Sequence, residues 1–325
     1  MNITMKSLLE WADEEHFAVV SFNYADLWTA LGIIRAAERE RAPIILQQVP
    51  PVVKNVGVGY LSGIGKAAAE YASVPVVHHL DHSTSPAMCF QAIDAGYGSV
   101  MIDGSAETME ENIRLTKTVV RYAHEKGVFV EGEIGKIRGK GWQGIAFKEG
   151  EEFLTRVEDA VTFVKETDVD ALAVGIGNAH GFYTQEPKLN IQRLAEINEA
   201  IDTKLVLHGG TGIPEEAVRD AIRNGINKVN VGTVILHSYL DTLKTTLTGL
   251  EKSQFNEGVF EDAVEAVSQA AAVWIRKTMS DHRVSDPKTT NRKVNAFRFV
   301  IFSRGLRRGR RCICGSPPAA PARSG

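Results

Sequence analysis

The sequence has few cysteines and no long apolar run. Its 325 residues include three cysteines, Cys89, Cys312 and Cys314, a sparse and odd-numbered set that does not suit a disulfide framework. No apolar stretch approaches the roughly 20 residues that cross a bilayer, and the N-terminal segment carries charges where a signal peptide is apolar. We therefore expect a protein of the reducing cytoplasm that does not associate with membranes.

Negative charge is missing from one end of the chain. From Arg292 onward the sequence has eight Arg and one Lys but no Asp or Glu, so the formal net charge of −3 becomes −12 without those nine residues. An acidic body does not suit a protein that binds nucleic acid. We expect residues 284–325 to be a basic, disordered tail. It could bind an acidic partner, but an extension of the chain without that role is the favoured interpretation.

Short apolar runs alternate with amphipathic stretches through the first 283 residues. Eight near-continuous apolar runs separated by helices are typical of a parallel sheet that is covered on both faces. The pattern predicts an α/β protein with one (β/α)8 (TIM) barrel domain over residues 1–283, and an open doubly wound sheet is the alternative. The expected strands are 17–22, 43–47, 74–80, 98–103, 128–134, 171–176, 204–208 and 228–231.

The segments between these strands carry helix signals. Residues 25–41 and 108–126 have helical periodicity, and residues 214–225 begin with proline and end with glycine, as helices often do. Residues 135–153 break this rhythm with glycines and charges, which predicts a long loop after the fifth strand. The glycines of residues 57–66 do not match a nucleotide-binding motif, because Ser62, Tyr60 and Ala67 occupy positions that such motifs reserve for other residues.

Three histidines stand at or near the expected ends of strands. His82 follows the third strand, His180 follows the sixth and His208 closes the seventh. Barrel enzymes keep their active sites at this rim, and three imidazoles with an open fourth position make a catalytic zinc site. One such histidine would be more often structural, whereas three on the same rim favour a metal centre.

Three carboxylates accompany these histidines. Asp81 directly precedes His82 and could move a proton to or from a bound hydroxyl, or could only orient a histidine. Glu131 and Glu133 lie two apart on the fifth strand and so share a face. Glu133 could be an additional metal ligand, or a buried carboxylate paired with Lys136 or Lys140.

Glycine-rich turns follow the last strands. Residues 208–212 read His-Gly-Gly-Thr-Gly, and residues 230–233 read Asn-Val-Gly-Thr. Glycines let the backbone approach a ligand, and the loops after the seventh and eighth strands are a frequent phosphate site on barrels. Thr211 and Thr233 could add hydroxyl donors. Turn and capping chemistry explains either motif alone, but both together favour phosphate binding.

Taken together, these residues resemble the class II, zinc-dependent ketose-bisphosphate aldolases, which include the fructose-bisphosphate and tagatose-bisphosphate aldolases. The likeness runs from about residue 5 to about residue 280. Its carriers are SFN (21–23), VVHHLDHST (76–84), SVMIDGSAETMEENI (99–113), VEGEIG (130–135), DALAVGIGNAHGFY (170–183), LVLHGGTGIP (205–214) and KVNVGT (228–233).

The resemblance implies an aldolase that reversibly cleaves a phosphorylated ketose to dihydroxyacetone phosphate and an aldehyde. It implies a catalytic Zn²⁺ on His82, His180 and His208, with Glu133 at a second or alternative metal position. Asp81 would act on the proton of the C4 hydroxyl. A homo-oligomer, a dimer or a tetramer, is the family norm. The substrate contacts would be Asn23, Gly181, Gly209, Thr211, Asn230 and Thr233.

The sequence departs from the family at three places. The family usually has a Gly-Gly-x-Glu-Asp loop after its metal-site glutamate, and its acid handles the proton at C3. Residues 136–142 carry no acid in that register, although Glu149, Glu151 or Glu152 could substitute. Val49, Pro50 and Pro51 stand where a serine and a glycine are common, and Val234 stands where an acid is common. These departures leave two alternatives open, a sugar-phosphate-binding relative without activity and a barrel metal hydrolase.

Overall fold

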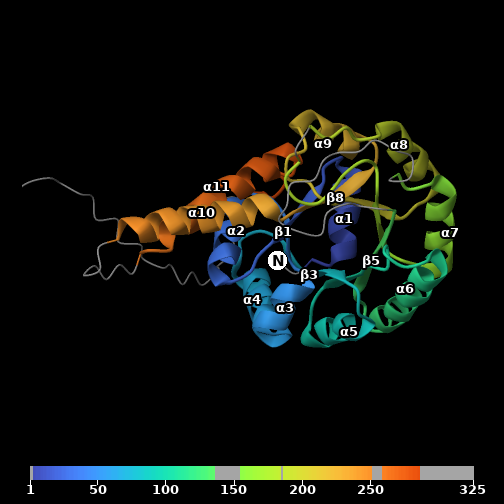
Figure 1. The fold of residues 1–325 in the computed structure, drawn as a ribbon, viewed down its shortest axis with the longest axis horizontal. Helices are drawn as coiled ribbons and strands as arrows, with labels where there is room; N and C mark the ends of the chain where they lie inside the picture. The colour runs from blue at the N-terminus through green and yellow to red at the C-terminus, as the bar shows by residue number, and fades with distance from the viewer. Residues whose placement is uncertain (1–2, 136–153, 184–185, 251–257, 286–325) are drawn as a thin grey trace, which may run out of the picture. The chain divides into compact units, whose positions relative to one another are not determined.

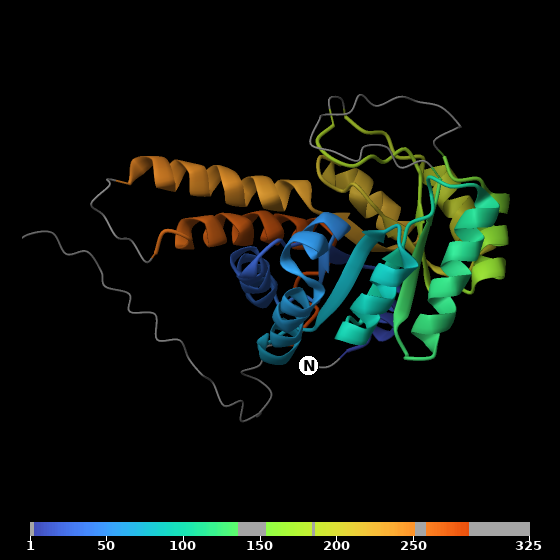
Figure 2. The ribbon, with the colours of Figure 1, turned by 60° about the horizontal axis from the view of Figure 1, so that its bottom comes forward.

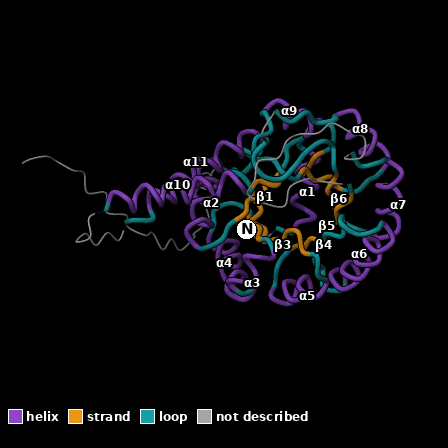
Figure 3. The backbone as a smooth tube through the Cα atoms, viewed as in Figure 1, coloured by secondary structure: helices purple, strands orange, loops and turns teal. Residues whose placement is uncertain are grey.

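Eight parallel strands close into a barrel in the computed structural model of this chain (Figure 1). The strands follow one another around the barrel in sequence order, and β8 pairs with β1 in parallel. Figure 3 shows the strands inside a ring of helices. This closure confirms the predicted (β/α)8 fold and excludes the open sheet. The strands are β1 (Val19–Asn23), β2 (Ile44–Gln48), β3 (Val76–Ser83), β4 (Ser99–Ile102), β5 (Phe129–Ile134), β6 (Ala171–Val174), β7 (Lys204–Leu207) and β8 (Ile226–Val231).

The structure describes residues 3–135, 154–183, 186–250 and 258–285. The chain divides into two units, Met1–Thr289 and Thr290–Gly325. Most of the expected loop over residues 135–153, and the basic tail beyond residue 285, lie outside the described residues, so both expectations stay predictions. None of the described helices is long and apolar enough to cross a membrane.

Helices occupy the segments between the strands, and each of the three predicted helices is present. The predicted segments 25–41, 108–126 and 214–225 hold α2, α6 and α9. The glycines of residues 57–66 lie largely in α4, which agrees with their failure to match a nucleotide-binding motif. The helices are α1 (Met5–Glu14), α2 (Leu27–Glu40), α3 (Pro50–Val56), α4 (Val58–Tyr71), α5 (Pro86–Ala95), α6 (Met109–His124), α7 (Val157–Thr167), α8 (Ile191–Ala200), α9 (Glu215–Arg223), α10 (Thr233–Gly249) and α11 (Glu261–Lys277).

The barrel interior is apolar at one end and polar at the other. Because side chains alternate along a strand, residues two apart on each strand stack in layers inside the barrel. At the N-terminal ends of the strands the layer is apolar, with Val19, Ile45, Val77 and Phe129, and it packs against buried residues of α1. Buried polar residues follow further along the same strands, so the polar part of the interior lies toward the C-terminal ends of the strands.

A helical pair, α10 and α11, lies side by side beyond the barrel (Figure 2). The helix α11 also packs against α2, where Gly32 makes the close approach possible. A Cβ on Gly32 would lie 2.7 Å from the backbone oxygen of Val264 and 2.7 Å from side-chain atoms of Val267. The ion pairs Arg35–Glu261 and Arg39–Glu265 line the exposed edge of the same contact.

We expect Gly32→Ala to destabilise the protein by about 1–3 kcal/mol, because the added methyl group meets a backbone carbonyl that cannot rotate away. Gly63→Ala is the matched control. Gly63 also lies inside a helix, but a Cβ there has no atom within 4 Å, so alanine should stabilise by about 0.5–1 kcal/mol. Urea unfolding of both variants measures the difference. Equal stabilities would contradict this account of the α2–α11 contact.

Candidate metal centre and substrate pocket

A break in the regular strand pattern brings Asp81 and His82 to the same site. Asp81 follows Val77 and His79 in the inward alternation of β3, so His82 should point outward. The register of β3 with β4 shifts between Leu80 and Ser83, and His82 has a positive φ of 48°. This irregularity turns the His82 ring inward as well. His82 therefore lies within β3, which extends to Ser83, and not after the strand as the sequence suggested.

His208 follows β7 directly and is fully buried. Gly209 comes next with φ of 67°, and a Cβ there would lie 1.9 Å from the backbone oxygen of Ala179. Only glycine fits this approach, because any side chain would overlap the neighbouring loop. The strand end that carries His208 therefore lies directly against the loop that carries His180.

His180 comes from the loop after β6, and two side chains fasten this loop to the end of β7. The amide of Asn178 donates to the backbone oxygen of His208 at 3.1 Å. The Tyr183 hydroxyl accepts from the backbone N–H of Ala179 at 2.8 Å and donates to the backbone oxygen of Gly209 at 3.1 Å. These bonds hold a residue six positions beyond its strand in a defined place.

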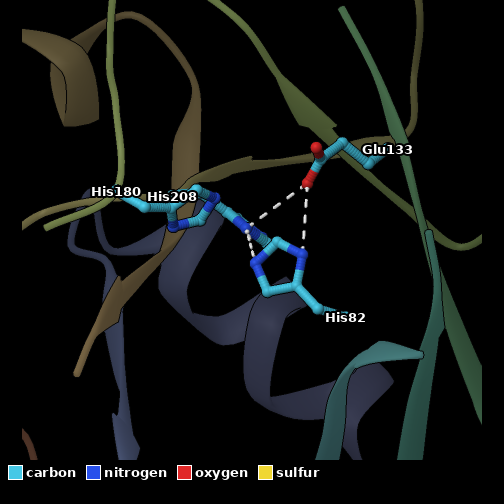
Figure 4. Close-up of side chains that lie close together, drawn as sticks. All are labelled: His82, Glu133, His180 and His208. Atoms are coloured by element: carbon cyan, nitrogen blue, oxygen red, sulfur yellow. Dashed lines mark hydrogen bonds and ion pairs between the residues drawn. The ribbon is translucent and has the colours of Figure 1, made fainter. Parts of the chain in front are cut away.

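The three histidines and Glu133 converge on one point (Figure 4). Each offers one ligand atom, and these atoms all lie within 4.8 Å of one another. His82 Nε2 lies 2.9 Å from His208 Nδ1, and Glu133 Oε2 lies 3.5 Å from the same Nδ1. Glu133 Oε2 is buried and has no hydrogen-bond partner among the described residues. A divalent cation fits this donor set and would supply the missing partner of that oxygen.

The field at this point favours positive charge. Burial alone would lower the pKa of His82, but the carboxylates of Asp81, Asp103 and Glu133 raise that pKa to about 9. Asp103 Oδ2 also lies 3.0 Å from Nδ1 of His82, which leaves Nε2 facing the cluster. Burial raises the pKa of Glu133. A bound cation would balance the surrounding carboxylates in place of a proton.

Asp81 is held with both carboxylate oxygens satisfied. The amide of Gln47 donates to Oδ2 at 3.0 Å, and the amide of Asn230 donates to Oδ1 at 3.0 Å. Gln47 also donates to Oδ1 of Asn23 at 2.9 Å. Asp81 lies in the pocket wall next to the histidine cluster. The two amide bonds therefore hold its carboxylate in a fixed orientation beside that cluster.

A pocket of about 610 Å³ opens above the cluster. The six residues expected to contact substrate all line this pocket, together with Asp81, His82 and His180. They are Asn23, Gly181, Gly209, Thr211, Asn230 and Thr233.

 Glu133 and His208 lie buried in the metal cluster beneath it. The structure therefore brings together the expected metal ligands, Asp81 and the expected substrate contacts, whereas Glu149, Glu151 and Glu152 lie outside the described residues.

Two stretches of the pocket wall differ in chemistry. The helix α10 begins at Thr233, and its N-cap Gly232 makes no side-chain capping bond, although the N–H of Val234 donates to the Thr211 hydroxyl at 3.4 Å. Gly232 and Thr233 line the pocket, so the positive end of the helix dipole favours an anion there. Val49, Pro50, Pro51 and Val52 form an apolar stretch of the wall where α3 begins. No Lys or Arg is among the described residues that line the pocket.

Several supporting residues were missed by the sequence reasoning. These residues orient the site or lie beneath it, and none was singled out from the sequence. They are Gln47, Asp103, Asn178, Tyr183 and Lys228. The signal for Lys228 was available, because it lies two residues before Asn230 on β8 and so shares its face. Asn178 and Tyr183 act through loop contacts that no local pattern shows.

Comparison with known proteins agrees with this geometry. Residues 3–283 match the family described as fructose-bisphosphate aldolase class-II. The chain belongs to this family. It is therefore a class II aldolase, an aldehyde-lyase, and the family implies a divalent metal, which the histidine cluster fits. Membership of this family disfavours both the hydrolase and the inactive relative.

Relatives of this class II aldolase extend over nearly its whole barrel. The 6-phospho-5-dehydro-2-deoxy-D-gluconate aldolase of Bacillus velezensis is 37% identical over 279 residues, which are 85% of this chain and 94% of the relative. The enzyme of the same name from Halalkalibacterium halodurans is 36% identical over 288 residues, which are 87% of this chain and 98% of the relative.

Solved structures share the fold. The YdjI aldolase from Escherichia coli K12 superposes with a TM-score of 0.76 at 30% identity, covering 88% of this chain and 100% of that one. The fructose-bisphosphate aldolase of Campylobacter jejuni superposes with a TM-score of 0.69 at 19% identity, covering 85% and 94%. The second likeness concerns the fold alone.

We expect Tyr183→Phe to destabilise the aldolase by about 1–3 kcal/mol, because the loss of the hydroxyl leaves the N–H of Ala179 and the oxygen of Gly209 without their partner. Tyr60→Phe is the control, since Tyr60 is 79% exposed and should change stability by less than about 0.5 kcal/mol. Urea unfolding of the metal-free proteins compares them. A neutral Tyr183→Phe would show that this hydroxyl does not fasten the His180 loop.

Proposed function

We propose that this class II aldolase binds Zn²⁺ through His82, His180 and His208 and cleaves a keto-sugar acid that carries one phosphate. The substrate we propose is 6-phospho-5-dehydro-2-deoxy-D-gluconate, the compound in the names of its relatives. Aldol cleavage of the C3–C4 bond of this compound yields dihydroxyacetone phosphate and 3-oxopropanoate. Asn23, Gly181, Gly209, Thr211, Asn230 and Thr233 are the proposed substrate contacts.

The difference between these two stretches of the pocket wall supports this choice of substrate. The glycine turns and the N-terminal end of α10 suit one phosphate. The apolar wall from Val49 to Val52 and the absence of Lys and Arg from the described lining do not suit a second. A substrate with a single phosphate agrees with this pocket better than a ketose bisphosphate does.

The donor set supports zinc. Three imidazoles are ligands that Zn²⁺ accepts in catalytic sites, and they leave a fourth position open for substrate. Glu133 lies within reach of the same point and is the proposed second or alternative metal position. When bound, the cation would supply Lewis-acid polarisation of the ketone oxygen of the substrate.

In this proposal, residues of the chain transfer the proton and hold the group that transfers it in place. Asp81 takes the proton of the hydroxyl β to the ketone as the carbon–carbon bond breaks, and returns it in the reverse direction. Gln47 and Asn230 hold the carboxylate of Asp81 for this step. Glu149, Glu151 and Glu152, the candidates for proton transfer at the neighbouring carbon, lie outside the described residues.

We also propose a homo-oligomer, a dimer or a tetramer, in the cytoplasm. Exposed Leu240, Leu247 and Val273 on α10 and α11 support an association surface on this helical pair. In the part of the chain that the structure describes, Cys89 is a buried free thiol, which suits a reducing compartment.

His180→Ala should weaken Zn²⁺ binding by at least about 100-fold, because it removes a proposed ligand. Loss of a residue that only hydrogen-bonds to a ligand already weakens metal binding by about 10–100-fold. Competition with a chromophoric chelator measures the affinity. His124→Ala on α6 is the control, since His124 pairs with Asp170 away from the pocket, and it should bind as the wild type does. Full affinity in His180→Ala would remove this residue from the ligand set.

The wild-type protein should release dihydroxyacetone phosphate from 6-phospho-5-dehydro-2-deoxy-D-gluconate faster than from fructose or tagatose bisphosphate. A coupled reductase assay follows the release, before and after chelation and zinc restoration. Asp81→Asn should lower the rate by about 10²–10⁴-fold with unchanged zinc affinity. Faster cleavage of a bisphosphate would contradict the proposed substrate, and an active Asp81→Asn would contradict the role of Asp81.

A further inference from the structure

A second polar layer lies directly beneath the metal cluster. His79 on β3, Glu131 on β5 and Lys228 on β8 each precede a residue of the upper layer by two positions, and so point inward below it. The side chains of all three are at most 1% exposed. None of them faces the pocket, so none has a place in the proposed chemistry.

Lys228 supplies the positive charge of this lower layer. His79, Asp81 and Glu131 offer ligand atoms within 4.8 Å of one another, as a metal site would. The ammonium of Lys228, however, lies 2.7 Å from Oε2 of Glu131 and already neutralises this carboxylate. Glu131 is therefore a carboxylate with both oxygens acting as acceptors.

The other oxygen of Glu131 faces a proposed metal ligand. Oε1 lies 2.8 Å from Nε2 of His208, and an ionised carboxylate can only accept, so Nε2 must carry the hydrogen. The amide of Asn230 lies 3.2 Å from the same nitrogen, but it donates to Asp81 at the shorter distance of 3.0 Å. A neutral imidazole carries one hydrogen, so Nδ1 of His208 presents its lone pair to the cluster.

We propose that Glu131 and Lys228 are positioning residues that set the tautomer and orientation of His208, and with them the affinity of the site for a divalent metal. The inference rests on the proposed role of His208 as a ligand. Glu131 acts through its hydrogen bond to Nε2, and Lys228 acts through Glu131 by keeping that carboxylate charged and directed. The arrangement is the same as the carboxylate–histidine–metal relay of other metalloproteins.

Glu131→Asp is the first test, because it keeps the charge opposite Lys228 but withdraws the acceptor from His208. We expect the affinity for Zn²⁺ to fall by about 10–100-fold, and the visible absorption spectrum of the Co²⁺-loaded protein to change as the ligand geometry changes. Competition with a chromophoric chelator measures affinity, and urea unfolding of the metal-free protein measures stability. A variant that loses stability but keeps wild-type affinity and spectrum would overturn the proposal.

A double-mutant cycle tests whether Lys228 acts through Glu131. Lys228→Met, Glu131→Gln and the double variant are compared, and the double variant removes both buried charges at once, so it should fold even where a single variant leaves a charge unpaired. We expect the double variant to bind metal no more weakly than the weaker single variant. Fully additive losses of affinity, or wild-type affinity in the double variant, would overturn the proposal.

Two controls separate this inference from the proposed function. Lys204→Met removes a lysine of β7 that pairs with Asp13 away from His208, and it should leave the affinity unchanged. His208→Ala should lose the metal. If His208→Ala keeps full affinity, the proposed ligand set fails and the positioning role fails with it. If His208→Ala loses the metal and Glu131→Asp does not, the positioning role alone fails.

Discussion

Charge buried inside a closed barrel must be balanced where it lies, and this constraint shapes the site. Lys228, Glu131 and Glu133 have almost no exposure to water, and an unpaired charge in such a place costs several kcal/mol. Lys228 balances Glu131, and Glu131 accepts from His208. Glu133 has an oxygen without a partner among the described residues, at the point where the histidine nitrogens converge. Lys228 balances the charge of the lower layer, in which Nε2 of His79 has no hydrogen-bond partner among the described residues, whereas the upper layer has the donor set for a cation.

The backbone places the three proposed histidine ligands in three different ways. His82 depends on an irregularity in β3 with a positive φ, His208 directly follows the end of β7, and His180 comes from a loop fastened to that end. Such strain and close packing are common where function needs a side chain that regular structure would direct elsewhere. The close approach of Gly209 to Ala179 packs the end of β7, which carries His208, directly against the loop that carries His180.

In the proposed function, the pocket adds substrate selectivity to the divalent metal that the family implies. The part proposed to bind phosphate has backbone groups near Gly232 and Thr233, and another stretch of the wall is apolar from Val49 to Val52. Backbone N–H groups recognise a phosphate without a cationic side chain. The difference between these two stretches of wall therefore depends on the path of the backbone as well as on the side chains.

The sequence by itself predicted the barrel, with an open sheet as the alternative, the rim at which the site lies, and the three histidines and Glu133 that meet there. Alternating apolar runs and helices specify a parallel barrel because both faces of each strand are buried, and strand ends in such a barrel must meet at one rim. Only the tertiary structure decided that His82 lies inside β3, that Tyr183 fastens the His180 loop, and that Lys228 lies beside Glu131. These contacts join residues as far as 97 positions apart. Local patterns describe which face a side chain takes, but they do not describe which distant side chain it meets there.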